Sequence, residues 1–312
     1  MPTANELQEW ARLLKNVRHH LDGQGYMEVS TNCLVQAGAF EGVIDPFQVA
    51  VGGKAFELHT SPEIEMKAIL AETQAPIYQI CRCFRDDPET GIHLKEFTML
   101  EFYRPWADYR ELMRECTELF SSLSGGTFIP RVVPMKDLVL EHSGLDLDTL
   151  IRREDLAKAL TQFPEIHISA GDSWEDLFFK FFVQRIEPTI LPDEPLFIHD
   201  YPSSVAALSK TTGTGTYVER FELYWHGMEI CNGCTELTGV GELQARYDTE
   251  SRIRARRGKL PHPFPDRLET AMRTMPAAAG VAVGMERLFW ALESKNSQKS
   301  GNQALSTTRT VT

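Results

Sequence analysis

The stretch 82–103 holds the residues best suited to chemistry. Arg85 follows the run 76–81, which alternates apolar and polar side chains as a half-buried strand does. After a short polar loop, the apolar and aromatic run 97–103 predicts a second strand, antiparallel to the first. A guanidinium group at the end of a strand can hold an anionic oxygen with two parallel donors. The stretch is therefore either an anion site on paired strands or a surface hairpin with a solvated, charged loop.

Two carboxylates further along the chain form a second candidate site. Glu222 and Glu229 lie in the runs 218–225 and 228–231, which the dipeptide His226-Gly227 joins as a predicted hairpin. On facing strands they could be two exposed charges. Together with phosphate oxygens, the same pair would suit Mg²⁺.

The segment 60–63 reads Thr-Ser-Pro-Glu and predicts the start of a helix. Ser61 fits the N-cap, Pro62 fits the first helical position, and Glu63 favours the positive end of the helix. This local role explains all of these residues without any ligand.

The cysteines allow a different interpretation. Cys231 and Cys234 form a C-x-x-C pair, and Cys81 and Cys83 add two more thiols, so a zinc or redox site is an alternative. A second C-x-x-C or a spaced histidine pair, which would strengthen that alternative, does not accompany it.

The elements that must position these residues are predicted from periodicity and from Gly and Pro punctuation. Helices are expected at 6–21, after 63, and at 109–122, 135–142, 153–163, 174–187 and 242–257. Strands are expected at 26–31, 56–59, 76–81, 97–103, 196–199, 218–225 and 228–231.

Composition limits the class of protein. The chain has 312 residues, 42% hydrophobic and 24% charged, which is ordinary for a globular protein with a large core. The formal net charge of −12 suits broad contact with a nucleic-acid backbone poorly. The chain shows neither a signal peptide nor an apolar run long enough to cross a bilayer, so we expect a cytoplasmic protein with reduced cysteines. We expect one catalytic domain over 1–293 and a polar, disordered tail over 294–312.

Three strings together resemble the class II aminoacyl-tRNA synthetases. Residues 84–87 (Phe-Arg-Asp-Asp) and 96–103 (Glu-Phe-Thr-Met-Leu-Glu-Phe-Tyr) are similar to motif 2, and 281–288 is similar to motif 3. Residues 229–236 match the lysyl-type string E-[IL]-x-N-G-x-x-E. The chain most resembles the free-standing, lysyl-type family whose members attach (R)-β-lysine to elongation factor P. The resemblance implies an α+β class II catalytic fold, with a mostly antiparallel sheet flanked by helices.

The resemblance also implies an ATP site and a reaction in which a carboxylate attacks the α-phosphate. Arg85 would bind the α-phosphate and the substrate carboxylate, Arg287 the γ-phosphate and the adenine, and Phe97 the other adenine face. Glu222 and Glu229 would hold Mg²⁺. The implied ATP contacts are Arg85, Asp86, Asp87, Leu94, Phe97, Glu229, Ile230, Gly284 and Arg287. His93 matches the loop histidine of motif 2, where it would order the loop over ATP or remain solvated.

The amino-acid pocket is implied in the same way. A lysine-like ammonium needs anionic partners once it is desolvated. The implied pocket residues are Ser61, Pro62, Glu63, Tyr103, Asn232, Glu236 and Ala282. Ala282 stands where lysyl-tRNA synthetases typically have glycine, and its extra methyl group could favour a β-amino acid by ~1–3 kcal/mol.

The partners follow from the resemblance as well. The family implies elongation factor P as acceptor, (R)-β-lysine or lysine as substrate, a homodimer through a motif 1-like region at 6–31, and no stable nucleic-acid or membrane partner. An anticodon-binding domain is not expected. The open alternatives are a free-standing lysyl-synthetase paralogue with another acceptor, and a non-catalytic paralogue that binds a nucleotide or amino acid.

Overall fold

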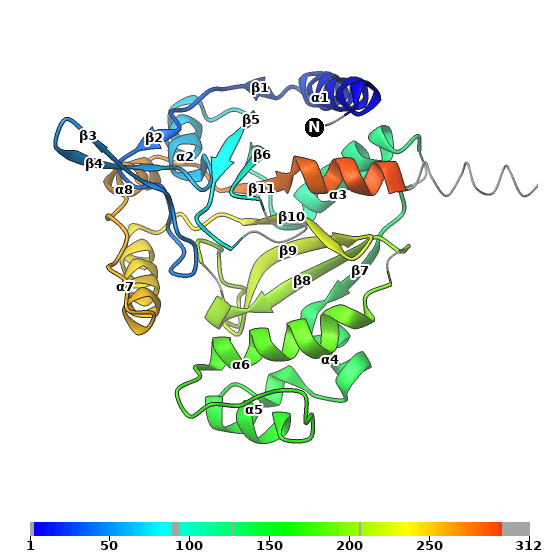
Figure 1. Cartoon of the computed structure of the whole chain (residues 1–312), viewed down its shortest axis with the longest axis vertical. Helices are drawn as coiled ribbons and strands as arrows, with labels where there is room; N and C mark the ends of the chain where they lie inside the picture. Colours follow the sequence, from blue (N-terminus) through cyan, green and yellow to red (C-terminus); the bar gives the residue numbers. More distant parts are fainter. Residues whose placement is uncertain (1–2, 89–93, 127, 192, 206, 295–312) are drawn as a thin grey trace, which may run out of the picture.

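The computed structural model describes residues 3–88, 94–126, 128–191, 193–205 and 207–294. A large sheet forms its centre (Figure 1). Its strands are β1 (Met27–Glu28), β5 (Ile77–Phe84), β6 (Glu96–Pro105), β7 (Arg131–Pro134), β8 (Leu196–Pro202), β9 (Tyr217–Trp225), β10 (Met228–Thr235) and β11 (Ala278–Gly284).

The strands of this sheet follow the order β1-β5-β6-β11-β10-β9-β8-β7. Only the two end pairs, β1 with β5 and β7 with β8, are parallel, and the pairs between them are antiparallel. With helices packed around the sheet, this confirms the predicted α+β class II fold.

A tight turn joins β9 to β10, as predicted. His226 and Gly227 both have positive φ, 51° and 72°, which is the geometry of a two-residue type I′ hairpin. Asn232 and Gly233, a dipeptide typical of turns, both lie inside β10. Glycine is required there, since a Cβ on Gly233 would approach the Phe221 ring to 2.6 Å.

The two faces of the sheet differ in character. On β6, Leu100 and Phe102 enter a core formed with α1 (Ala4–Gly23), α3 (Tyr109–Leu123) and the helix at 285–294. The alternate residues of β6 point to the opposite face, where they line a cavity. Because successive side chains of β6 point to opposite faces, one face of the strand packs in the apolar core and the other lines the cavity.

Further elements pack beside the large sheet (Figure 1). A three-stranded sheet consists of β2 (Leu34–Val35), β4 (Lys54–Leu58) and β3 (Gln48–Val51). The remaining α-helices are α2 (Glu63–Thr73), α4 (Met135–Ser143), α5 (Arg153–Leu160), α6 (Trp174–Phe181), α7 (Val240–Arg256) and α8 (Asp266–Met272). Helices α2 and α8 share one apolar core, and α4 to α6 share another with β8.

Several predicted boundaries were wrong. The strand expected at 26–31 is only Met27–Glu28, and the helix expected at 174–187 is α-helical as far as Phe181 and continues without a break in other helical geometries. A π turn and a 3₁₀ turn follow it before Ile190, and Pro188, which lacks an N–H, lies in the second of them.

One further expectation concerns membrane-spanning helices, and two others fall on residues that the structure does not describe. Among the described residues, no helix has both the length and the apolar character needed to cross a membrane. The proposed role of His93 and nearly all of the expected tail at 294–312 fall outside the described residues.

Candidate active site

One cavity of about 750 Å³ opens on the polar face of the large sheet. Most of the residues implied by the motifs line it: Ser61, Glu63, Arg85, Asp87, Leu94, Phe97, Tyr103, Glu222, Glu229, Ile230, Asn232, Glu236, Ala282, Gly284 and Arg287. Pro62 and Asp86 do not. Pro62 occupies the cap position of α2, and the Asp86 carboxylate pairs with Lys95 Nζ at 2.8 Å.

Arg85 forms one end of the cavity with an unsatisfied donor. Its Nε is buried and has no hydrogen-bond partner among the described residues, and its guanidinium lies 5.2 Å from the centre of the Phe97 ring. The backbone is fixed because Arg85 N donates to Lys95 O at 2.9 Å. A guanidinium group whose buried Nε has no partner in the described part of the chain is suited to an anionic ligand.

Arg287 reaches the same end from the helix after β11. Its Nη1 donates to the Glu229 carbonyl at 2.9 Å and lies 3.6 Å from a Glu229 carboxylate oxygen. Phe97 also lines this end of the cavity, next to the Arg85 guanidinium. We call Arg85, Phe97, Glu229 and Arg287 the arginine end.

Glu286, which the motif analysis did not single out, ties the two arginine-bearing segments together. Both of its carboxylate oxygens accept from Thr98 N at 2.9 Å. The pairing of β6 with β11 places Met99 opposite Gly284 in the same region. The segment with Arg287 is therefore fixed directly to the strand that follows Arg85.

The two hairpin carboxylates differ in their surroundings. Glu222 accepts from Tyr201 OH at 2.6 Å, from Tyr224 OH at 3.0 Å and from Arg220 Nη2 at 2.6 Å. Burial and the charge of Glu222 raise the pKa of Glu229 to about 7. A cation between these oxygens would relieve their repulsion, and an all-oxygen set fits Mg²⁺. Glu222 also accepts from Asn232 Nδ2 at 3.5 Å, so it would have to offer lone pairs that these four donors leave free.

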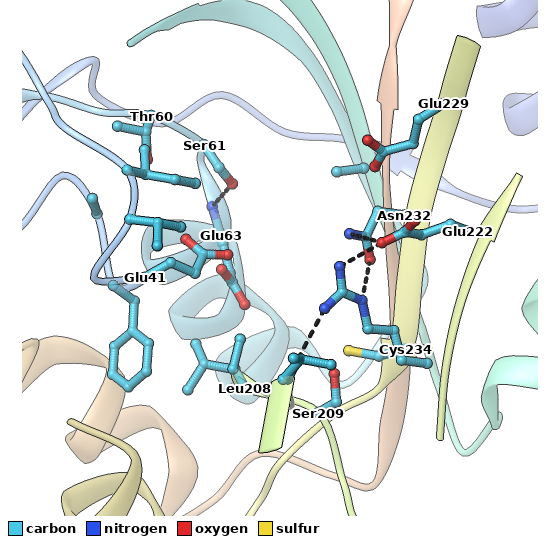
Figure 2. A pocket seen from close by; sticks show the side chains of 18 of the residues that line it. Glu41, Thr60, Ser61, Glu63, Leu208, Ser209, Glu222, Glu229, Asn232 and Cys234 are labelled. Atoms are coloured by element: carbon cyan, nitrogen blue, oxygen red, sulfur yellow. Dashed lines mark hydrogen bonds and ion pairs between the residues drawn. The ribbon is translucent and has the colours of Figure 1, made fainter. Parts of the chain in front are cut away.

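Glu222 and Asn232 lie side by side on the cavity wall formed by β9 and β10 (Figure 2), and Arg220 contacts both. Its Nε donates to Asn232 Oδ1 at 3.2 Å, and its Nη1 donates to the Val205 carbonyl at 3.0 Å. Asn232 thus turns its amide group toward the cavity beside Glu222. The sequence interpretation missed Arg220, although its place two residues before Glu222 on a strand puts both on one face.

At the opposite end, a lysine that the sequence interpretation also missed lies behind the cavity wall, against Glu63 and Glu236. Lys67 is fully buried, and its Nζ lies 2.5 Å from oxygens of both Glu63 and Glu236. The two carboxylates implied to bind a substrate ammonium therefore already share an internal one. The sequence did indicate a contact between Lys67 and Glu63, because Lys67 lies one helical turn after Glu63.

Glu101 is the third carboxyl group at this end. It accepts from Tyr103 OH at 2.5 Å and from Ser61 Oγ at 2.7 Å. Burial, and then the charge of Glu63, raise the pKa of Glu101 to about 8. Strand alternation with Tyr103 would have identified it. We call Glu63, Lys67, Glu101, Tyr103 and Glu236 the acid pocket.

Ser61 links α2 to the acid pocket. The helix begins at Glu63, so Pro62 takes the cap position predicted for Ser61. Ser61 Oγ still accepts from Glu63 N, at 3.0 Å, while donating to Glu101. The hydroxyl group of Ser61 therefore accepts from the first residue of α2 and also donates to the acid pocket.

Strand β11 forms the floor between the two ends. A Cβ at Gly280 would collide with the Tyr103 ring and the Glu236 carboxylate, so only glycine leaves room for the acid pocket. Ala282 faces Glu101 and Asn232 on the neighbouring strands and adds one methyl group to the cavity wall. Gly284 is less constrained, because a Cβ there would make only ordinary contact with Arg287.

The C-x-x-C alternative is wrong as a metal site. Residues three apart on a strand point to opposite faces, and Cys231 enters the core while Cys234 lines the cavity. Cys81 and Cys83, which are two apart on β5, share a face instead.

A family model for class II tRNA synthetases (D, K and N) matches residues 3–299. The chain belongs to this family. It is an ATP-using ligase of the class that forms aminoacyl-adenylates.

Curated relatives narrow the comparison. The chain is 32% identical over 298 residues to an elongation factor P–(R)-β-lysine ligase of Edwardsiella ictaluri, covering 92% of this chain and 90% of the relative. It is 33% identical over 289 residues to a protein of the same name from Pectobacterium atrosepticum, covering 89% and 88%. A third, from Enterobacter sp., is 34% identical over 291 residues, covering 89% and 88%.

Proposed function

We propose that the protein adenylates (R)-β-lysine, or lysine less efficiently, and transfers the acyl group to a lysine side chain of elongation factor P. One observation carries this proposal: a single cavity has two guanidinium groups at one end and an acidic pocket at the other. An amino acid with a terminal ammonium and a reacting carboxylate would fit this polarity. The names of the relatives support the choice of substrate and acceptor.

In the first step, a carboxylate oxygen of the substrate attacks the α-phosphorus of ATP and pyrophosphate leaves. Arg85 would hold the carboxylate and the α-phosphate, and its buried, unpartnered Nε supports that role. Arg287 would bind the outer phosphates after leaving Glu229. Fixed positive charge lowers the barrier by stabilising charge that develops on phosphate oxygens.

Glu222 and Glu229 would hold Mg²⁺ with the phosphate oxygens. The ion would neutralise charge on the pyrophosphate leaving group.

In the second step, the ε-amine of the acceptor lysine attacks the acyl carbon and AMP leaves. The amine must be neutral to attack, and its proton passes to solvent or to the leaving phosphate. The acid pocket keeps the ammonium of the substrate away from this step, so only the activated carboxyl group is presented to the acceptor.

Ala282 is proposed to set the preference between β- and α-amino acids. Its methyl group narrows the floor beside Glu101 and Asn232, where an α-amino group would lie. Replacing it with glycine removes this bulk without adding any polar group. An Ala282→Gly variant should gain activity with lysine relative to (R)-β-lysine by roughly 10-fold, the scale of one methyl group.

A pyrophosphate-exchange panel tests the proposal. Lysine, both β-lysine enantiomers and ornithine are compared, and we expect the highest kcat/KM with (R)-β-lysine. With purified elongation factor P as acceptor, mass spectrometry should detect one added lysyl unit, and a lysine-to-arginine acceptor variant should not be modified. Absence of exchange with every amino acid would refute the enzyme, while exchange without transfer would refute the acceptor.

We also propose that the protein forms a homodimer through α1 and β1. Helix α1 and strand β1 form an edge of the molecule, where Leu7 and Met27 are exposed. Sedimentation equilibrium should give twice the chain mass, and Met27→Glu should shift it toward the monomer.

A further inference from the structure

A second cluster of ligand-type side chains lies outside the cavity wall, on strand β5 and the segment after β4. Among the described residues, His59, Cys81 and Cys83 each offer an atom such that all three lie within 4.8 Å of one another. Cys81 and Cys83 project from the same face of β5, and their sulfur atoms are 4.0 Å apart. Both cysteines are free thiols.

The hydrogen bonds of His59 determine which nitrogen is available. Its Nε2 lies 2.7 Å from the Arg82 carbonyl, which can only accept, so Nε2 carries the hydrogen. Nδ1 is then the nitrogen with a lone pair. It is buried and has no hydrogen-bond partner among the described residues. Metal-binding histidines commonly have this arrangement, with the second nitrogen donating to a carbonyl.

The backbone holds these groups in place before any ligand arrives. Phe84 N donates to His59 O at 3.1 Å, and His59 N donates to Cys33 O at 2.9 Å. The side chains of His59 and Cys83 are almost fully buried, whereas Cys81 is partly exposed and leaves a path from solvent. The cluster is therefore rigid, largely dry and accessible on one side.

We propose that His59, Cys81 and Cys83 bind one soft divalent metal ion, with Zn²⁺ as the natural candidate and water as the fourth ligand. Tetrahedral Zn²⁺ with Zn–S bonds of about 2.3 Å places two sulfur atoms roughly 3.8 Å apart. The 4.0 Å separation of Cys81 and Cys83 needs little adjustment to reach that value. Thiolate and imidazole ligands favour zinc over magnesium or calcium.

Binding involves no change of oxidation state. The two thiol groups release their protons to solvent as the Zn–S bonds form, and the neutral imidazole of His59 donates its Nδ1 lone pair. The site is independent of the Glu222–Glu229 pair, which is built from oxygen ligands alone.

The position of the cluster gives the metal a structural role. His59 lies two residues before Ser61, and Cys83 lies two residues before Arg85. A metal ion would therefore join the segment that leads to the acid pocket to the strand that leads to the arginine end. This inference goes beyond the proposed function and does not depend on its substrate or acceptor.

Cobalt substitution tests the site without an activity assay. The full-length chain, reduced and freed of metal with a chelator, is titrated with Co²⁺ under anaerobic conditions. We expect one equivalent to produce thiolate-to-cobalt charge-transfer absorption and intense tetrahedral d–d bands, and Zn²⁺ to displace it. Cobalt at the Glu222–Glu229 oxygens would produce no thiolate band, so the spectrum separates the two sites.

Single substitutions test which side chains bind the metal ion. Cys81→Ser, which alters a partly exposed residue, should weaken Zn²⁺ binding at least 10- to 100-fold in competition with a chromophoric chelator. His59→Ala should do the same, whereas Cys116→Ala, which removes a buried thiol on α3, should not. Absence of thiolate–cobalt absorption in the wild-type chain overturns the proposal, whether or not any variant folds. A Cys81–Cys83 disulfide that persists under reducing conditions overturns it too.

Discussion

Replacing Lys67 with methionine should change how the stability of the protein depends on pH. Methionine keeps an unbranched side chain of similar length but removes the ammonium that contacts Glu63 and Glu236. Glu236 is almost fully buried, and burial raises its pKa to about 7 even with the ammonium of Lys67 opposing that shift. Without Lys67, the pKa of Glu236 should rise further.

The direction and the size of this pH effect follow from the thermodynamic linkage between proton binding and folding. A carboxyl group with a raised pKa loses folded-state stability as the pH rises from its unfolded value toward its folded value, and the loss then stops. For Glu236 in the wild type, that window runs from about 4.5 to about 7. In Lys67→Met the loss should continue above pH 7, at about 1.4 kcal/mol per pH unit. Relative to the wild type, the free energy of unfolding of Lys67→Met should therefore be about 2 kcal/mol lower at pH 8.5 than at pH 7.

Urea unfolding at pH 6, 7 and 8.5 measures this difference directly. A matched control is Lys136→Met, which removes an exposed ammonium that pairs with Asp148 at 3.0 Å and should show little pH dependence. If the difference in unfolding free energy between Lys67→Met and the wild type is the same at all three pH values, Lys67 does not keep Glu236 ionised. The charge assignment of the acid pocket would then be incorrect.

Three further predictions concern the proposed reaction. Arg85→Ala should lower pyrophosphate exchange at least ~10²-fold, because a preorganised donor to the reacting phosphate is lost, whereas exchange by Arg114→Ala, which removes an exposed arginine paired with Glu111 on α3, should be nearly unchanged. Glu229→Gln should raise the Mg²⁺ concentration for half-maximal exchange about 10-fold, while Glu219→Gln, which lies outside the cavity wall, should not. Binding of lysine near pH 7 should release protons, because the raised pKa values of the acid pocket keep carboxyl groups partly protonated until an ammonium arrives. Calorimetry in buffers of different ionisation enthalpy detects that release, and identical heats in all buffers would contradict it.

The framework of the site could be predicted from the sequence because it depends on local patterns. The alternation along 76–81 indicated strand β5, the apolar and aromatic run 97–103 indicated the strand that carries Phe97 and Tyr103, and the dipeptide His226-Gly227 indicated the central hairpin. These features need only a period of two and a turn, both of which are encoded within a few residues.

The rest depends on contacts between distant segments. The pairing of Lys67 with Glu236 joins residues far apart in the chain, so no local pattern reveals it. The C-x-x-C spacing suggested the wrong thiols, because spacing alone does not account for the opposite directions of Cys231 and Cys234 on a strand. The small β2–β3–β4 sheet was missed except for part of β4, since its strands are short and mostly exposed.

Strand β6 fixes the separation of the two ends of the cavity. Phe97 lies at the arginine end and Tyr103 lies in the acid pocket, and six residues of extended chain span about 20 Å. Because β6 is hydrogen-bonded on both sides, by β5 and β11, this separation cannot shrink to suit a smaller ligand. A free lysine is much shorter than this span and could not contact both ends. An amino acid joined to a nucleotide is long enough, so the length of one strand would match the adenylate rather than the free amino acid.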